Sequence, residues 1–328
     1  MNTVSNAGAS ALGIRSIGTA LPEKFVRVEE LATSSSAETL RGFGFDGAWI
    51  GQDAAALGCA AAQAALCDAH LQAGEIGALF WASALSENHV RPSKHAGVTA
   101  ADAALQHFCY QGSWLQEKLG LDHATVCGIA QQGCAGMFSA LRQARALLMS
   151  EPEMEHVLCV GADLFPADAP REVLYNVISD AACACIVSRE SAHYRWLGFH
   201  QVSKGYYWDV PAKQSEIIAA YFPTAALTVR GLFGKLRIKS TDIDLVIPTG
   251  VNRSSWPILM RLCGIPDDRL YEPGQRFGHT IAADSFLLLE EARSRGALRP
   301  GMKILLFAYG FGSSWCALLV ETTDLLAL

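Results

Sequence analysis

The stretch CGIAQQGCAGMFSALRQARALL, Cys127–Leu148, has a counterpart in FGHTIAADSFLLLEEARSRGAL, Phe277–Leu298. Each stretch passes through a glycine-marked segment into a run typical of a helix. Each is also preceded by a helix-like segment and an apolar strand-like run, and is followed by two more such runs. The same order and approximate spacing in the two parts of the chain indicate an internal duplication of one α/β unit.

The strand-like runs are continuous in Val, Ile, Leu, Cys and Ala and do not alternate with polar residues. This pattern is typical of strands that are covered by helices on both faces. We therefore expect an α/β fold with two layered halves, residues 1–190 and 191–328, and with helices outside and between two sheets. A pseudo-twofold arrangement of the halves predicts that the helix starts carrying Cys134 and His279 face each other.

Composition excludes several classes of function. Of 328 residues, 51% are hydrophobic and 18% are charged, and the net charge is −6 with a pI near 5.8. This balance favours a large core and argues against a nucleic-acid or membrane-surface protein. The N-terminus lacks the pattern of a secretory signal, and the ten cysteines show no CxxC pair or metal-ligand spacing. We expect a cytoplasmic protein with reduced core cysteines and no metal.

Cys134 allows two interpretations. It is one of many cysteines and fits a buried apolar position, as we expect for the other nine. However, it lies between Gly133 and Gly136 at a predicted helix start, where the helix dipole and free N–H groups favour an anion. The glycines leave room for a substrate, so the pattern favours a nucleophile.

His279 and Asp284 are the second candidate pair. A neutral imidazole can accept a proton from an attacking group, and a carboxylate can hold its other ring N–H. The spacing of five is not that of neighbours on one helix face, so the pair requires His279 to precede the first regular turn. A helix-capping histidine with a solvated aspartate is the alternative. The apolar run around Asp284 argues instead for a buried, partnered carboxylate.

Four segments together resemble ketoacyl synthase III enzymes, which have the thiolase fold. They are IGTALPEKFVRVEELA (Ile17–Ala32), CGIAQQGCAGMFSAL (Cys127–Leu141), VIPTGVN (Val246–Asn252) and FAYGFGSSW (Phe307–Trp315). The resemblance covers most of the chain in the right order and implies a layered αβαβα arrangement. It is weaker over residues 39–51 and 86–110, and we expect the latter to help line the substrate pocket.

The departures from that family change the implied reaction. Decarboxylating members use a cysteine, a histidine and an asparagine, but Thr249 stands at the histidine position and His279 at the asparagine position. The pair of Cys134 and His279 with Asp284 resembles a smaller branch, the ketoacyl synthase III-like acyltransferases of antibiotic pathways. That branch transfers acyl groups in two steps without forming a carbon–carbon bond. A decarboxylating enzyme that primes a polyketide or fatty-acid chain, and a non-catalytic partner subunit, are the alternatives.

The resemblance also implies further roles. The backbone N–H groups of Cys134 and Gly312 would form an oxyanion hole, although Gly310–Gly312 alone equally fits a hairpin turn. Thr249 and Asn252 would shape the site. The acyl donor would be coenzyme A or the phosphopantetheine of an acyl carrier protein, with no permanently bound cofactor, and the enzyme would be a homodimer. Candidate carrier-docking residues, with a solvated surface as the alternative reading, are Lys235, Arg237, Arg253 and Arg261.

Overall fold

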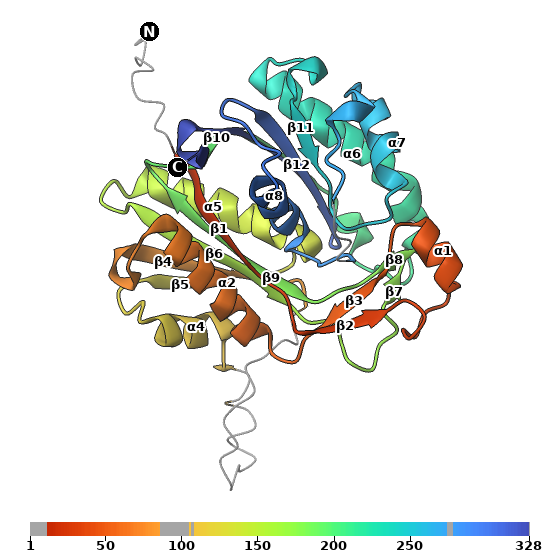
Figure 1. Ribbon diagram of the computed structural model, residues 1–328, viewed down its shortest axis with the longest axis horizontal. Coiled ribbons are helices and arrows are strands. Elements are labelled where there is room, and N and C mark those ends of the chain that lie inside the picture. The colour runs from red at the N-terminus through yellow and green to blue at the C-terminus, as the bar shows by residue number, and fades with distance from the viewer. Residues whose placement is uncertain (1–11, 86–104, 106–107, 274–277, 328) are drawn as a thin grey trace, which may run out of the picture.

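The computed structural model describes residues 12–85, 105, 108–273 and 278–327 (Figure 1). Most of the expected pocket region at residues 86–110 therefore lies outside the described residues. A single sheet of nine strands runs through the molecule in the order β11-β12-β13-β10-β1-β9-β6-β4-β5. The strands are β1 (Gly13–Ala20), β4 (Ile76–Ala82), β5 (Thr125–Ile129), β6 (His156–Asp163), β9 (Ala181–Ser188), β10 (Tyr194–Ser203), β11 (Leu245–Ile247), β12 (Lys303–Gly310) and β13 (Ser314–Thr322).

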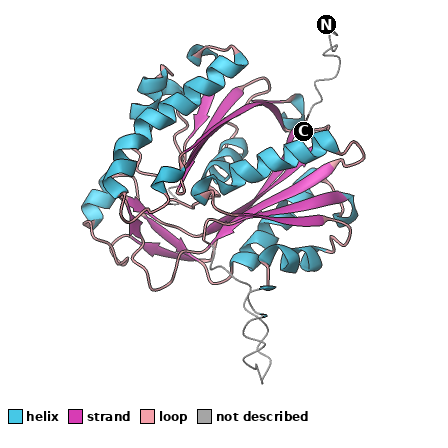
Figure 2. Cartoon of the chain, turned by 180° about the vertical axis from the view of Figure 1, so that it is seen from behind, coloured by secondary structure: helices cyan, strands magenta, loops and turns pink. Residues whose placement is uncertain are grey.

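Helices divide this sheet into two halves and cover each half on both faces. Helices α2 (Ala54–Ala69) and α4 (Gln111–Leu119) pack on the outside of β4, β6 and β9. Helices α5 (Gly136–Ser150) and α8 (Asp284–Ser294) lie together between the two half-sheets. Helices α6 (Gln214–Leu236) and α7 (Ser255–Cys263) cover the outside of β12 and β13, as Figures 1 and 2 show. The layers confirm the predicted αβαβα fold.

The buried strands explain why this layering forms. All eight residues of β9 are buried, and seven of the eight residues of β6 are buried, because each strand has a helix on both faces. Cys159, Cys183 and Cys185 lie in these strands as apolar core residues, and Cys316 occupies a similar place in β13. The expectation that all nine other cysteines are buried is wrong for Cys67 and Cys127, which are exposed.

The two half-sheets meet where β1 pairs with β10. This antiparallel pairing contains Gly13 opposite Arg195 and Ile14 opposite Tyr194. On either side of it the strand order is mirrored, since β9, β6 and β4 follow β1 while β13, β12 and β11 follow β10. The predicted division after residue 190 falls in the connection between β9 and β10.

The first half of α6 was not expected from the sequence. The helix-like segment that precedes the second set of strand-like runs is Ala225–Leu236, but the helix begins at Gln214 and continues through Pro223. Pro223 lies in the third turn of the helix and is solvent-exposed, so its ring does not occupy the core. Although α6 is long and apolar enough to cross a membrane, its apolar face packs against β10 and β13.

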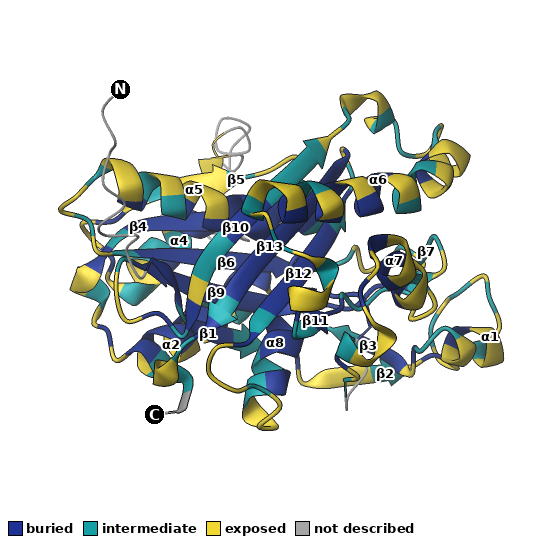
Figure 3. Cartoon of the chain, turned by 90° about the horizontal axis from the view of Figure 1, so that it is seen from above, coloured by how far each residue is buried: buried dark blue, intermediate teal, exposed yellow. Residues whose placement is uncertain are grey.

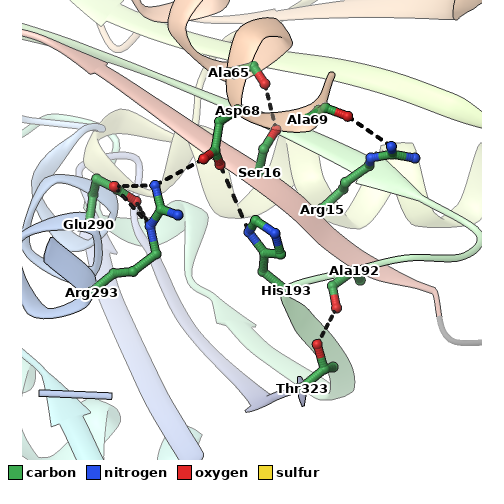
Figure 4. A network of polar contacts seen from close by, with 10 residues as sticks. All are labelled: Arg15, Ser16, Ala65, Asp68, Ala69, Ala192, His193, Glu290, Arg293 and Thr323. Carbon is green, nitrogen blue, oxygen red and sulfur yellow. Dashed lines mark hydrogen bonds and ion pairs between the residues drawn. The ribbon is translucent and has the colours of Figure 1, made fainter. Parts of the chain in front are cut away.

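A polar network ties the layers together far from the start of α8 (Figure 4). Arg293 of α8 forms ion pairs with Asp68 of α2 and with Glu290, at 3.1 and 2.7 Å. The other oxygen of Asp68 lies 3.8 Å from Nδ1 of His193, which precedes β10. This network joins an outer helix, an inner helix and the connection between the halves.

Four short strands and one short helix complete the fold beside the second half-sheet. Strands β2 and β3 form an antiparallel pair with α1 in their connection, and β7 and β8 form a hairpin. A small cluster that includes Val28, Leu40 and Val177 packs these elements together. They are β2 (Lys24–Arg27), β3 (Gly47–Ile50), β7 (Glu172–Val173), β8 (Asn176–Val177) and α1 (Ala37–Gly42).

Candidate active site

Cys134 lies in a single 3-10 turn, Gly133–Ala135, immediately before α5. The glycine turn after β12 packs against this segment at very short range. A Cβ atom on Gly310 would lie 1.8 Å from the carbonyl oxygen of Gln132, and one on Gly133 would lie 2.5 Å from the backbone nitrogen of Phe311. Gly133 also has φ +50°, a conformation that favours glycine. These glycines bring the 310–312 turn beside the nucleophile segment.

His279 is fixed by its own backbone. Its N–H donates to the carbonyl of Val177 at 2.8 Å, and its carbonyl accepts from the N–H of Ser179 at 2.9 Å. The side chain then points to the start of α5, where Nε2 lies 3.2 Å from Sγ of Cys134. The predicted meeting of the two helix starts is therefore seen in the structure, across 145 residues of sequence.

Asp284 completes a chain of three side chains. Its Oδ2 lies 2.5 Å from Nδ1 of His279, and its Oδ1 accepts from the N–H and the hydroxyl of Thr280 at 2.6 and 2.7 Å. Helix α8 begins at Asp284, so His279 precedes the first regular turn and folds back, as the spacing of five requires. Only 3% of Asp284 and 8% of His279 is exposed, which excludes the reading as a solvated carboxylate.

The electrostatics of the pair favour a charged imidazole. Burial lowers the pKa of His279, but the charge of Asp284 and the proximity of Cys134 outweigh this effect and hold the pKa well above its ordinary value. The hydrogen bond that Nδ1 of His279 donates to Asp284 also fixes the ring so that Nε2 faces the sulfur. This arrangement can stabilise a thiolate on Cys134 and can supply a proton to a leaving group.

A cavity of about 420 Å³ opens onto Cys134 and His279. Its wall is largely apolar, with a few polar groups, as is usual for a small-molecule site. Both predicted site-shaping residues, Thr249 and Asn252, lie in this wall. The N–H of Asn252 donates to Oδ1 of Asn176, at 2.8 Å, so the loop after β11 is tied to the β7–β8 hairpin.

Two tyrosines in the cavity wall were not identified from the sequence. The rings of Tyr221 and Tyr309 meet edge to face with their centroids 5.3 Å apart. Burial raises the pKa of Tyr309 to about 12 and also raises the pKa of Tyr221, so both keep their protons at neutral pH. Tyr309 directly precedes Gly310 of the glycine-rich turn. Its position next to that turn could have identified Tyr309 from the sequence.

Asp163, the last residue of β6, forms hydrogen bonds with the segment that provides part of the cavity wall. Its Oδ1 accepts from the hydroxyl of Ser83 at 2.8 Å and from the N–H groups of Ala84 and Leu85 at 2.9 and 3.2 Å. Ala84 and Leu85 line the cavity. Burial raises the pKa of the Asp163 carboxyl to about 6, although these hydrogen bonds partly oppose the shift.

A pH dependence of stability follows from Asp163. Because the folded state holds this proton more tightly, the contribution of Asp163 to stability is greatest below pH 3.8 and is lost as the pH rises through about 6. The loss is about 3 kcal/mol. Asp163→Asn keeps the acceptor oxygen and cannot ionise, so it should gain stability relative to the wild type between pH 4 and 7. Urea unfolding at both pH values measures this, and a constant difference would contradict it.

The four candidate docking residues do not lie together. Arg253 is exposed next to Asn252 in the cavity wall, and Arg261 is exposed in the last turn of α7. Lys235 and Arg237 lie at the C-terminal end of α6, whereas Ile217 and Tyr221 near its start line the cavity. At 1.5 Å per residue, Lys235 is roughly 20 Å along the helix from Tyr221. The structure therefore separates Lys235 and Arg237 from the cavity.

Comparison with known proteins places this geometry in a family. The profile of 3-oxoacyl-(acyl-carrier-protein) synthase III matches residues 130–205, and the profile of the C-terminal part of the same family matches residues 234–322. The chain belongs to the ketoacyl synthase III-like proteins of the thiolase fold. The matched residues include Cys134 in the first region and both His279 and Asp284 in the second.

Individual relatives agree with this assignment. The β-ketoacyl-(acyl-carrier-protein) synthase III of Campylobacter jejuni (strain RM1221) is 25% identical over 94% of this chain and 97% of its own length. Among solved structures, the acyltransferase ChlB3 superposes with a TM-score of 0.80 at 22% identity, covering 95% of this chain and 98% of ChlB3. The synthase III of Aquifex aeolicus VF5 superposes with a TM-score of 0.78 at 22% identity, covering 94% and 99%. These structures share the fold of this ketoacyl synthase III-like chain.

Proposed function

We propose that this ketoacyl synthase III-like protein is an acyltransferase that forms no carbon–carbon bond. An acyl group moves from a carrier-protein or coenzyme A thioester to Cys134, and then to a hydroxyl, an amine or a carrier thiol. The observation that carries the proposal is the hydrogen-bonded chain from Cys134 through His279 to Asp284. The similarity of fold to the acyltransferase ChlB3 supports acyl transfer. A setting in secondary metabolism, such as antibiotic biosynthesis, is part of the same proposal and rests on the resemblance of the sequence.

In the first step the Cys134 thiolate attacks the thioester carbonyl carbon. Negative charge builds up on the carbonyl oxygen. The backbone N–H groups of Cys134 and Gly312 are the proposed donors that stabilise this charge. The carbon–sulfur bond to the carrier then breaks. The departing thiolate takes the proton of the His279 imidazolium, which leaves an acyl-cysteine and a neutral imidazole.

In the second step the neutral His279 acts as the general base. The acceptor enters the cavity, and Nε2 removes its proton as the acceptor oxygen, nitrogen or sulfur attacks the acyl carbon. The bond to Cys134 breaks and the thiolate returns beside the imidazolium. Asp284 keeps the ring oriented throughout and stabilises its positive charge. This sequence predicts ping-pong kinetics.

Decarboxylation needs a different set of groups. The enolate that forms from a malonyl thioester requires donors beside its carbonyl oxygen. His279 is the one histidine among the described residues of this wall, and its Nε2 already lies 3.2 Å from the sulfur of Cys134. Thr249 cannot titrate in the working pH range. The sequence relatives named β-ketoacyl synthase III favour the decarboxylating alternative, and a third alternative, a non-catalytic partner subunit, does not account for the intact Cys134 chain.

Carbon dioxide release separates the two reactions. We expect the acyl-loaded enzyme to release no carbon dioxide from malonyl-carrier protein above the background of Cys134→Ala. Under the same conditions it should pass its acyl group to one of a panel of sugar, alcohol, amine and thiol acceptors. The two products are measured by radiolabelled gas trapping and by mass spectrometry. Carbon dioxide release that depends on the acyl-enzyme would establish the condensing alternative instead.

Arg253 is the docking residue that we retain for a carrier protein. It is exposed on the loop after β11, next to Asn252 of the cavity wall, where it can meet acidic residues of a carrier while the acyl arm enters. Arg253→Glu should raise KM for a carrier-bound donor by about tenfold and leave kcat and the KM for a coenzyme A donor within twofold, since rim charges act mainly on encounter. Arg237→Glu, at the C-terminal end of α6 and away from the cavity, is the matched control. Equal effects of the two variants would refute this docking site.

A further inference from the structure

A second cavity, of about 440 Å³, lies between α5, β10 and the end of α6 and shares no lining residue with the catalytic cavity. Figure 3 shows α5 and α6 on the same side of the molecule with β10 between them. Strand β10 pairs with β1 only at Tyr194 and Arg195, so its remaining edge is open to this cavity. Three cationic side chains line it, namely Arg142, Arg145 and Lys235.

These cations have no counter-charge in the described part of the chain. Arg142 donates to Oε1 of Gln201 at 3.1 Å, and Lys235 donates to the carbonyl of Phe199 at 3.1 Å. Nε of Arg145 is buried and has no hydrogen-bond partner among the described residues. None of the three cations forms an ion pair there, and no carboxylate lines the cavity. Arg142 and Lys235 are solvent-exposed and Arg145 is partly buried, so the cluster presents unpaired positive charge that attracts an anion.

Aromatic rings hold the two arginines in place. The guanidinium of Arg142 lies over the ring of Phe199, with 5.5 Å to the centroid, and that of Arg145 lies over Trp196 at 5.7 Å. Stacking of this kind restricts the planar groups and leaves their N–H edges free for a ligand. The site is therefore organised before any ligand binds.

We infer that this cavity binds the phosphate group of a small phosphorylated molecule. A phosphate dianion matches three cations better than a single carboxylate does, and guanidinium groups bind its oxygens through paired hydrogen bonds. Lys235, which lies in the last turn of α6 and lines this cavity, takes part in this site and not in carrier docking.

Hydrogen bonds link the phosphate site to the nucleophile segment. Gln201 accepts from Arg142 and donates to Oε1 of Gln132 at 3.1 Å, and the hydroxyl of Ser139 donates to the same oxygen at 3.1 Å. Gln132 lies two residues before Cys134. Phosphate binding thus acts on the segment that positions the nucleophile, and we expect it to change the rate at which Cys134 is acylated.

Binding is tested on the full chain with inorganic phosphate and phenyl phosphate, at constant ionic strength balanced with chloride. We expect a saturable rise in the thermal midpoint and heat of binding by calorimetry. The double variant Arg142→Gln/Arg145→Gln should weaken affinity by at least about tenfold, since it removes two of three cations, while the exposed control Arg27→Gln should not. Lys235→Gln provides a second variant if the double variant does not fold.

The outcomes separate this inference from the proposed function, because binding is measured without acyl transfer. An equal, non-saturating rise in every variant is the general effect of a stabilising salt and would overturn the site. A preference for phenyl phosphate over inorganic phosphate would indicate an organic ester as the ligand. Acylation is then followed by mass spectrometry with and without phosphate. A rate that does not respond to bound phosphate in the wild type would refute the link through Gln201.

Discussion

Replacing Cys134 with alanine is expected to abolish the acyl-enzyme and to lower turnover by about 10³-fold or more. Incubation of the wild type with an acyl thioester should add the mass of one acyl group, and peptide mapping should place it on Cys134. The reason is geometric as well as chemical, because Cys134 has a histidine nitrogen 3.2 Å from its sulfur and also lies in the wall of the catalytic cavity.

The chain offers a matched control for this result. Cys127 is an exposed thiol on β5, seven residues earlier, so Cys127→Ala tests whether exposure alone leads to labelling. We expect Cys127→Ala to keep full activity and the full adduct. The cysteines of β6 and β9 are buried, and burial raises the pKa of Cys159 and Cys183, which keeps them as inert thiols. Retained activity in Cys134→Ala, or an adduct on another cysteine, would contradict the mechanism.

The fold was predictable because its strands are buried on both faces. Continuous apolar runs such as that of β9 distinguish a sheet that is buried on both faces from a sheet with one solvent-exposed face. The repeated order of these runs reveals the duplication. What the pattern could not show is that the two sheets join edge to edge. That junction consists of only two residue pairs between β1 and β10, and local sequence carries no signal for pairing between strands so far apart.

In the site, the catalytic residues could be predicted from the sequence, whereas several residues of the cavity wall could not. Cys134 and His279 lie at glycine-marked helix starts, and the apolar neighbours of Asp284 indicate burial. The residues of the cavity wall were harder to predict from the sequence, because Asn176 lies on a strand of only two residues, which is too short to show a periodic pattern. Tyr221 lies in the half of α6 that precedes Pro223, where a proline argues against a helix. Both residues reach the site through tertiary contacts alone.

The second large effect is expected from Asp284→Asn. Asparagine keeps an oxygen for the N–H and hydroxyl of Thr280 but replaces the carboxylate oxygen that faces Nδ1 of His279 with an amide donor. The ring then keeps its proton on Nε2, which points at Cys134 and can no longer accept a proton from the acyl acceptor. Transfer should slow by about 10² to 10⁴-fold, as for triads whose carboxylate is made neutral.

A single-turnover experiment measures this effect on the step it concerns. The acyl-enzyme is formed first, the acceptor is added, and the loss of the acyl group from Cys134 is followed by mass spectrometry.

The pH profile of Asp284→Asn adds a readout that a purely structural defect would not change. Because the charge of Asp284 helps to hold the pKa of His279 well above its ordinary value, the variant should shift the histidine limb of the rate profile to lower pH. Asp68→Asn, which neutralises a carboxylate in the network far from the site, is the control and should leave the limb unchanged. Decay of the acyl-enzyme at the wild-type rate in Asp284→Asn would show that His279 does not depend on this carboxylate, and the acid–base assignment would then have to be abandoned.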